Sequence, residues 1–265
     1  MRRALALVAA TALLTTAIAL PISGCGDDEA EGGEGSGERT RLVVSAGSSM
    51  AEALEACAPE FEETENADVR LSFGGSDELA AQIRQGAPVD VYAAANTSLP
   101  EELHDEDLLS EPVEFATNEL VLAVPADSDI RSLEDVAKEG PEVVMGSESV
   151  PIGSYTRAAL AKLPPEQEEA ILAGVVSNEP DVKGIVGKLT QGAGDAGFVY
   201  ATDVNATGGD LKAIDLPDEL DPQVTYAAGV PTEASEPELG KEFVSGLTRG
   251  PCADALQEAG FGAAP

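Results

Sequence analysis

The pattern that decides the fold stands in residues 42–61, LVVSAGSSMAEALEACAPEF. It starts with an apolar run, passes through a turn of small residues, and continues from Met50 in a helical pattern with Leu54 and Phe61 on one face. Short apolar runs favour strands, and apolar residues three to four positions apart favour helices. We therefore predict a strand, a turn that includes Ser49, and a helix in direct succession.

The same unit recurs further along the chain. Residues 69–73 alternate like a strand, run into Gly74-Gly75-Ser76, and are followed by a helical pattern that stops at Gly86; a third strand is predicted at 89–94. Alternation of strand and helix predicts parallel sheets covered by helices, with ligands bound at the carboxyl ends of the strands. The fold class predicted from this pattern is α/β.

A second set of strands and helices begins at Glu119 and implies a second lobe. Its strands are predicted at residues 120–124, 143–145 and 197–200, and its helices at 132–138, 155–163 and 181–191. A strand at 224–230 and two helical patterns, 237–247 and 251–259, then have the length to return to the first lobe. We predict a discontinuous lobe one, residues 40–117 and 228–265, and a lobe two of residues 118–227.

The N-terminus is typical of an exported lipoprotein. Two arginines precede an apolar run that is too short for a membrane span, so residues 1–24 are predicted to be a signal peptide. The run ends in Ile-Ser-Gly-Cys, which resembles the bacterial lipobox and predicts lipid attachment at Cys25; the alternative is an ordinary signal peptide with a chance cysteine. Residues 25–39, rich in glycine and acid, are predicted to be a flexible tether that leaves the protein anchored to the outer face of the cytoplasmic membrane.

Charge excludes several classes of function. The chain has 49 acidic and 15 basic residues and a formal net charge of −34, so nucleic acids and anionic lipid surfaces would repel it. Its one histidine, His104, lies in a strongly polar run and is predicted to be a solvated surface residue. Histidine-based triads and histidine-rich zinc sites are therefore not expected.

Two further cysteines, Cys57 and Cys252, are predicted to form a disulfide. An even pair of cysteines in an exported protein indicates a disulfide before it indicates a metal site or a nucleophile. The large separation of the two residues in sequence also excludes a local metal knuckle.

Five segments resemble, in order and spacing, the substrate-binding proteins of molybdate ABC importers. They are residues 43–50 (VVSAGSSM), 72–76 (SFGGS), 86–91 (GAPVDV), 150–155 (VPIGSY) and 197–200 (GFVY). The resemblance covers about residues 42–262. It implies a two-lobed type II periplasmic-binding-protein fold with a ligand cleft between the lobes. It also implies molybdate and tungstate as ligands, an ABC permease as partner, a monomer, and no enzymatic activity or cofactor.

Matched position by position, the resemblance implies a ligand site with five members. Its hydroxyl donors are Ser49, Ser76 and Tyr200, and its backbone donors are Ile152 and Val182. All except Tyr200 fall at or near predicted helix N-termini. Free N–H groups and the positive end of the helix dipole meet there, so a dianion can be bound without lysine or arginine.

Ordinary structural roles are open for the same residues. Serine is a preferred helix N-cap, so Ser49 and Ser76 could serve only that purpose, and Tyr200 could be a residue at the edge of the core. Asp77 departs from the family, which often has a hydroxyl at this position. We expect its carboxylate to face away from the ligand, since an inward carboxylate would repel a dianion and favour a protonated anion instead.

Other functions are also open. The protein could bind another anion such as sulfate, or it could be an adhesion or interaction lipoprotein without a ligand. The sequence has no G-x-S-x-G elbow, P-loop or zinc motif to support an enzyme. Ferric-ion binders of similar architecture use clustered tyrosines, whereas the four tyrosines here are isolated along the chain: Tyr92, Tyr155, Tyr200 and Tyr226.

Replacement of the predicted lipidation site should release the protein from the membrane. In a bacterial host that processes lipoproteins, we expect Cys25→Ala to move the protein into the medium or the soluble envelope fraction, because it removes the sulfur that carries the lipid. Detergent partitioning measures the change. A mutant that partitions like the wild type would contradict lipid attachment at Cys25.

Overall fold

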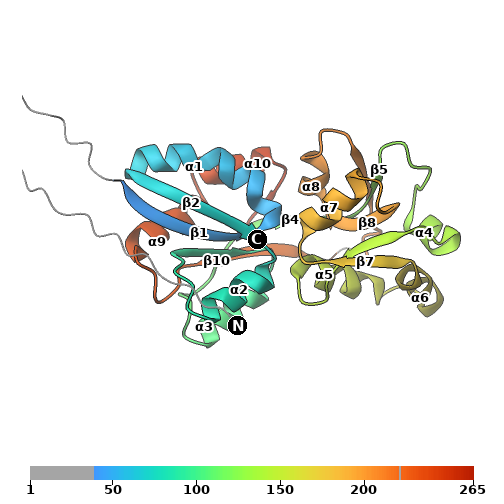
Figure 1. Ribbon diagram of the computed structural model, residues 1–265, viewed down its shortest axis with the longest axis horizontal. Coiled ribbons are helices and arrows are strands. Elements are labelled where there is room, and N and C mark those ends of the chain that lie inside the picture. Colours follow the sequence, from blue (N-terminus) through green and yellow to red (C-terminus); the bar gives the residue numbers. More distant parts are fainter. Residues whose placement is uncertain (1–38, 221) are drawn as a thin grey trace, which may run out of the picture. The chain divides into compact units, whose positions relative to one another are not determined.

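The computed structural model describes residues 39–220 and 222–265 (Figure 1). The predicted signal peptide (1–24), the lipidation site Cys25 and tether residues 26–38 lie outside the described residues, so their predictions stay untested. Within the described part of the chain, the strands form two separate sheets with helices packed on them. No helix in that part is both long and apolar enough to cross a membrane.

The first sheet has six strands and combines both ends of the described chain. Its strand order is β11-β4-β10-β3-β1-β2. β1 runs parallel to β2 and β3, whereas β10 runs antiparallel to β3 and β4, and β11 antiparallel to β4. The strands are β1 (Thr40–Gly47), β2 (Ala67–Gly74), β3 (Val91–Ala94), β4 (Val113–Asn118), β10 (Val224–Gly229) and β11 (Gly262–Ala263).

The second sheet has five strands in the order β7-β6-β8-β5-β9. β6 runs parallel to β7 and β8, and β5 runs antiparallel to β8 and β9. The strands are β5 (Leu120–Pro125), β6 (Val143–Gly146), β7 (Val175–Glu179), β8 (Ala196–Tyr200) and β9 (Leu211–Asp215). All five residues of β8 are buried, as expected for a strand with covered faces.

Helices complete two lobes. Lobe one is the first sheet with η1 (Ser48–Met50), α1 (Ala51–Glu65), α2 (Ser76–Arg84), α3 (Ser98–Asp105), α9 (Pro237–Gly246) and α10 (Pro251–Glu258). Lobe two is the second sheet with α4 (Leu133–Glu139), α5 (Pro151–Leu160), α6 (Pro165–Ala173), α7 (Val182–Thr190) and α8 (Ala201–Asn205). In lobe one, α1 and α10 lie together, apart from α2 and α3 (Figure 1).

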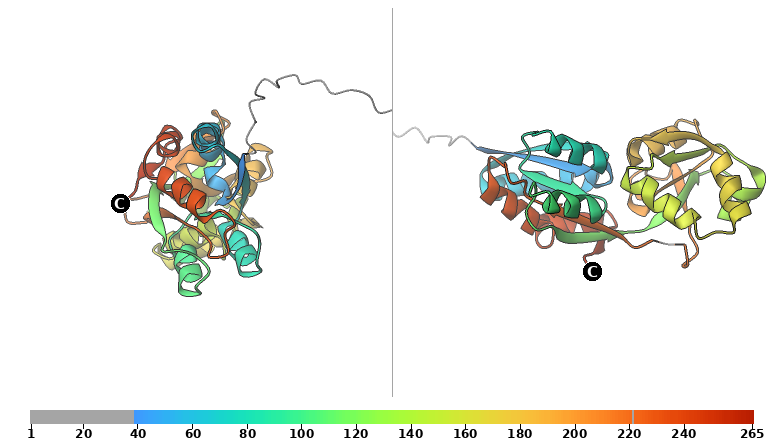
Figure 2. Two further views of the ribbon diagram at one scale, coloured as in Figure 1. Left: turned by 90° about the vertical axis from the view of Figure 1, so that its left-hand side faces the viewer. Right: turned by 90° about the horizontal axis from the view of Figure 1, so that it is seen from below.

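The chain passes between the sheets twice. β4 ends at Asn118 and β5 begins at Leu120, while the return leads from β9 to β10. The two passages run close together, since Val224 of β10 pairs with Asn118 of β4 (Figure 2). β10 joins the first sheet from Val224, a few residues before the predicted boundary at 227/228, and the boundaries themselves stay predictions.

The expectation of parallel sheets was wrong in part, because both sheets are mixed. A strand reached through a helical crossover returns in the same direction, as β1, β2 and β3 do. β5 and β10 enter their sheets directly from the other lobe, so no crossover fixes their direction. The sequence pattern also missed several short elements, among them α3, β4, α6, β7 and β9, whose sequences are short or carry few apolar residues.

The two cysteines lie close together between α1 and α10. Cys57 and Cys252 are each 3% exposed, and their Cα atoms are 4.9 Å apart, a separation that suits a disulfide. Nearby, the rings of Phe61 and Phe243 meet edge to face with centroids 5.0 Å apart. The C-terminal segment therefore packs on α1.

Loss of the predicted disulfide should destabilise lobe one. Replacing Cys57 and Cys252 together by serine should lower the free energy of unfolding by at most about 4–5 kcal/mol, because the bond would close a long loop in the unfolded chain. Denaturant unfolding of the exported protein gives this difference. Non-reducing mass spectrometry is the control, and two free thiols on the wild type would contradict the disulfide.

Candidate functional site

A small cavity lies where turns of lobe one meet helix N-termini of lobe two. Its lobe-one wall comes from the turns after β1, β2 and β3, and its lobe-two wall from the starts of α5 and α7 and the end of β8. The lining residues are Gly47, Ser48, Ser49, Gly74, Gly75, Ser76 and Ala95 from lobe one, and Val150, Pro151, Ile152, Asp181, Val182 and Tyr200 from lobe two. All five residues of the predicted site are in this set.

The size of the cavity restricts its guest. The centre of a water molecule can occupy about 20 Å³ of it, which is room for one roughly spherical guest about 3 Å in radius. A small polyatomic ion has this size, whereas a sugar or a peptide is much larger.

Ser76 and Tyr200 each have a hydroxyl proton without an acceptor among the described residues. The Ser76 Oγ atom accepts a hydrogen bond from the backbone N–H of Ala95 at 3.2 Å, so its own proton is available to a guest. Tyr200 is 1% exposed, and its buried hydroxyl has no hydrogen-bond partner in the described part of the chain. Burial raises the pKa of Tyr200 well above its usual value, so this hydroxyl keeps its proton and remains a donor.

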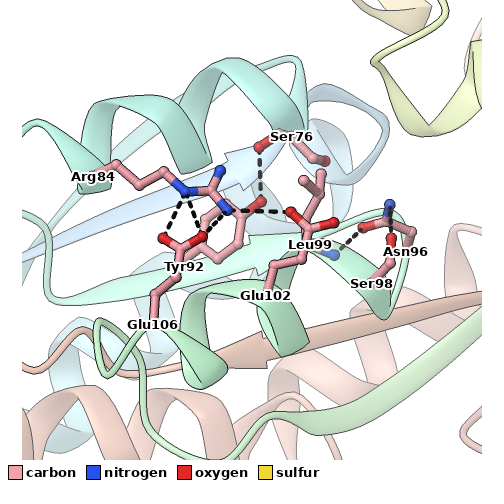
Figure 3. Close-up of polar contacts among 8 residues, drawn as sticks. All are labelled: Ser76, Arg84, Tyr92, Asn96, Ser98, Leu99, Glu102 and Glu106. Atoms are coloured by element: carbon pink, nitrogen blue, oxygen red, sulfur yellow. Dashed lines mark hydrogen bonds and ion pairs between the residues drawn. The ribbon is translucent and has the colours of Figure 1, made fainter.

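Contacts of neighbouring side chains fix the position of Ser76 at the start of α2. The buried Tyr92 hydroxyl donates to the Ser76 carbonyl oxygen at 2.7 Å (Figure 3). Arg84, at the other end of α2, donates to Glu102 at 3.2 Å and to Glu106 at 2.8 Å, which ties α2 to α3. These contacts hold the N-terminus of α2 against the cavity.

Ser49 has a partner that sequence reasoning missed. Its Oγ atom lies 3.0 Å from the hydroxyl of Tyr226, a fully buried residue of β10. The rings of Tyr226 and Tyr200 also meet, with centroids 6.0 Å apart, so these two tyrosines are isolated along the chain but not in space. No sequence pattern could have predicted the contact between Ser49 and Tyr226, which are 177 positions apart in the chain.

No cluster of three or more candidate metal ligands occurs among the described residues.

Backbone donors come from the first turns of α5 and α7. α5 begins at Pro151, earlier than the predicted start at residue 155, because proline is favoured as the first residue of a helix. Ile152 is therefore already in the first turn, where N–H groups have no partner within the helix. Val182 is the first residue of α7, and the Asp181 side chain caps that helix by accepting from the Gly184 N–H at 2.9 Å.

No lysine or arginine is among the residues that line the cavity in the described structure. A cluster of charged side chains includes Lys183, the residue after the lining residue Val182. Lys183 Nζ is 2.8 Å from Glu52 Oε1 of α1 and 3.1 Å from Asp203 Oδ1 of α8. Burial raises the pKa of Asp203 to about 7, although the Lys183 ammonium opposes the change. The cavity thus combines neutral hydroxyl and N–H donors with one carboxylate, that of Asp181, which caps α7. The adjacent ion pair between Lys183 and Glu52 joins the lobes.

Asp77 is not among the residues that line the cavity. It lies in the first turn of α2, where a carboxylate suits the helix dipole. Its Oδ1 atom is buried and has no hydrogen-bond partner among the described residues. His104 is exposed, as predicted, but it lies in the last turn of α3 and its Nδ1 atom is 3.0 Å from the carbonyl oxygen of Leu109.

Comparison with known proteins agrees with this architecture. The molybdate-binding protein ModA of Mycobacterium tuberculosis (strain ATCC 25618 / H37Rv) is 31% identical over 258 residues, which cover 95% of this chain and 96% of that protein. The substrate-binding domain of a putative molybdenum ABC transporter from Clostridium difficile is 25% identical with a TM-score of 0.65, covering 85% of this chain and all of that one (100%). The periplasmic molybdate-binding protein of Azotobacter vinelandii has a TM-score of 0.74 at 19% identity and covers 83% of this chain and 98% of its own.

A family model described as bacterial extracellular solute-binding protein matches residues 42–262. The match includes all of the second sheet, the first sheet except for Thr40, Arg41 and Ala263, and every residue that lines the cavity. The chain therefore belongs to the bacterial extracellular solute-binding proteins, a family of binding proteins and not of enzymes.

Proposed function

We propose that this protein is the substrate-binding component of a molybdate ABC importer. It captures molybdate, and tungstate as its near-isosteric relative, and delivers the ion to the permease. It acts as a monomer in the cell envelope, anchored through Cys25 to the outer face of the cytoplasmic membrane. Molybdate-binding relatives that match 95% of the chain support this assignment.

The observation that carries the proposal is the unpartnered Tyr200 hydroxyl in a cavity of ion size. A buried polar group without a hydrogen bond costs about 1–3 kcal/mol, so its presence indicates a missing acceptor. In the same cavity the Ser76 hydroxyl proton lacks an acceptor among the described residues. The first turns of α5 and α7 add backbone N–H groups that have no partner within their helices. A guest that accepts all of these bonds must carry oxygen atoms on several sides, as a tetrahedral oxyanion does.

The overall charge of −34 does not prevent anion binding. Charges farther away than about 8 Å are largely screened at physiological salt. A hydrogen bond to a charged group contributes about 1.5–3 kcal/mol, so several short bonds exceed the residual repulsion. Helix dipoles at α2, α5 and α7 add to the same effect.

Selectivity follows from the five proposed ligand residues, which offer hydroxyl and N–H donors and no acceptor. The one carboxylate in the lining, Asp181, already accepts from the Gly184 N–H as the cap of α7. In isothermal titration of the mature domain, we expect molybdate and tungstate to bind most tightly. Sulfate should bind much more weakly, and phosphate most weakly of all. Hydrogen phosphate would leave its own proton unpaired, at a cost of about 1–3 kcal/mol. Sulfate avoids that cost, but its shorter bonds cannot reach the donors of both lobes at once. Phosphate binding as tight as that of molybdate would refute the assignment and direct attention to Asp77.

The serine hydroxyls give the matching mutational test. Ser49→Ala and Ser76→Ala should each weaken molybdate binding by at least about fivefold, since each removes a hydrogen bond to a charged ligand. Ser98→Ala is the control, because Ser98, like Ser76, is the first residue of a lobe-one helix but is exposed and outside the cavity. Normal binding by both site variants would show that these residues are plain N-terminal helix residues.

Gly75 provides a separate test of lobe closure. Its backbone (φ −65°, ψ 131°) is one that any residue can adopt, but a methyl group here would overlap the carbonyl oxygen of Pro180 in lobe two. Within lobe one it would also approach Asp77 Oδ1 to 2.9 Å, and this side-chain atom can move aside. Gly75→Ala should therefore keep the lobes apart and weaken molybdate binding about tenfold, as overpacking costs about 1–3 kcal/mol. Titration calorimetry measures the affinity, and the melting temperature without ligand should change little.

Gly74→Ala is the matched control for this experiment. A methyl group at Gly74 would meet only Leu79 of its own lobe, at an ordinary contact distance of 3.6 Å. Its molybdate affinity should stay near that of the wild type. Equal affinities of both alanine variants would mean that ligand binding does not require the lobe contact at Gly75.

A further inference from the structure

The hydroxyl of Tyr226 is buried and has two hydrogen-bond partners among the described residues. The residue is 0% exposed, and its hydroxyl reaches two polar atoms among the described residues: Ser49 Oγ at 3.0 Å and Asn118 Nδ2 at 3.3 Å. Neither Tyr226 nor Asn118 lines the cavity. The hydrogen-bonded route from these two residues to a bound ion therefore runs through Ser49. The Tyr226 ring also meets that of Tyr200, a lining residue, and Tyr226→Phe leaves this ring contact in place.

The amide of Asn118 has a fixed orientation. Its Oδ1 atom accepts from the Glu119 N–H at 2.9 Å, and its Nδ2 atom donates to Thr202 Oγ1 at 2.9 Å as well as to Tyr226. An amide nitrogen donates and does not accept. The Tyr226 oxygen is therefore the acceptor in its contact with Asn118.

This direction determines the direction of the next bond. Tyr226 has a single hydroxyl proton, and Ser49 Oγ is the remaining acceptor within its reach in the described structure. Burial raises the pKa of Tyr226 above its usual value, so the proton is retained. Ser49 accepts it and is left with its own proton to donate towards the cavity that it lines.

We propose that Asn118 and Tyr226 are positioning residues for ligand binding, which orient the Ser49 hydroxyl as a donor to the bound oxyanion. The proposal rests on the proposed function of the cavity. Bonds that run in one direction, from Asn118 to Tyr226 to Ser49, polarise one another and make the last donor stronger. The chain of bonds starts at the end of β4, where the backbone passes to lobe two, and Asn118 also bonds to Thr202 of α8.

The ring of Tyr226 has a separate structural role that the test must leave intact. It packs edge to face against Phe115 and Phe261, with centroids 6.1 Å and 5.3 Å apart. Tyr226→Phe keeps these contacts and removes only the hydroxyl. It is therefore the substitution that separates proton donation from packing.

A double-mutant cycle tests the proposal. Dissociation constants for molybdate are measured for the wild type, Tyr226→Phe, Ser49→Ala and the double variant, from the ligand-dependent rise in melting temperature, which also reports weak binding. We expect Tyr226→Phe to weaken binding roughly three- to tenfold in the wild type. In the Ser49→Ala background the same substitution should change the constant by less than about twofold, because the residue through which it acts is gone.

Tyr92→Phe is the matched control, since it also removes a buried tyrosine hydroxyl from lobe one. That hydroxyl donates to the Ser76 carbonyl oxygen and not to Ser49. Its effect on affinity should therefore be the same in the wild type and in Ser49→Ala. An equal effect of Tyr226→Phe in both backgrounds, or no effect in either, would overturn the proposal.

Asn118→Ala gives a second measurement that leaves both hydroxyls in place. It removes the donor that sets the direction of the Tyr226 proton, so binding should weaken in the wild type but not further in Tyr226→Phe. Further weakening in Tyr226→Phe would contradict the proposed order of bonds. The failure of the proposed function would look different: the wild type would then show no molybdate-dependent rise in melting temperature at all.

Discussion

Removing an oxyanion from water requires donors for its oxygens, because a buried charge without hydrogen bonds is very costly. For the function proposed here, this requirement explains the construction of the cavity. Each wall is a helix N-terminus or a turn after a strand, where N–H groups are free. The Ser76 oxygen accepts from the Ala95 N–H, and the Tyr200 hydroxyl has no partner among the described residues. Neutral donors meet the requirement in a chain with 49 acidic residues.

The fold supplies these donors because both lobes present the same edge to the cavity. Strands that run parallel end at a common edge, and the following helices begin there. β1 and β2 lead into η1 and α2 in lobe one, while β6 and β7 lead into α5 and α7 in lobe two. The chain passes between the lobes from β4 to β5 and from β9 to β10. The neighbouring strands β4 and β10 supply Asn118 and Tyr226, which are hydrogen-bonded to each other, and Tyr226 contacts Ser49.

Much of the fold could be predicted, and the errors have physical causes. The succession of strand, turn and helix at residues 42–61 is local, so short-range pattern was sufficient there. The mixed direction of the sheets was missed because β5 and β10 arrive from the other lobe rather than through a helical crossover. The early start of α5 was missed although Pro151 is a signal for a first helical residue.

The sequence by itself determined the charge, the α/β class and the position of Ser49, Ser76 and Val182 near helix starts, since these depend on composition and on neighbours along the chain. Only the tertiary structure decided which polar groups face each other. The contact of Ser49 with Tyr226, the unpartnered hydroxyl of Tyr200 and the raised pKa of Asp203 all arise from burial between segments far apart in sequence. Hydrogen bonding and desolvation depend on distance in space, which a local pattern does not encode.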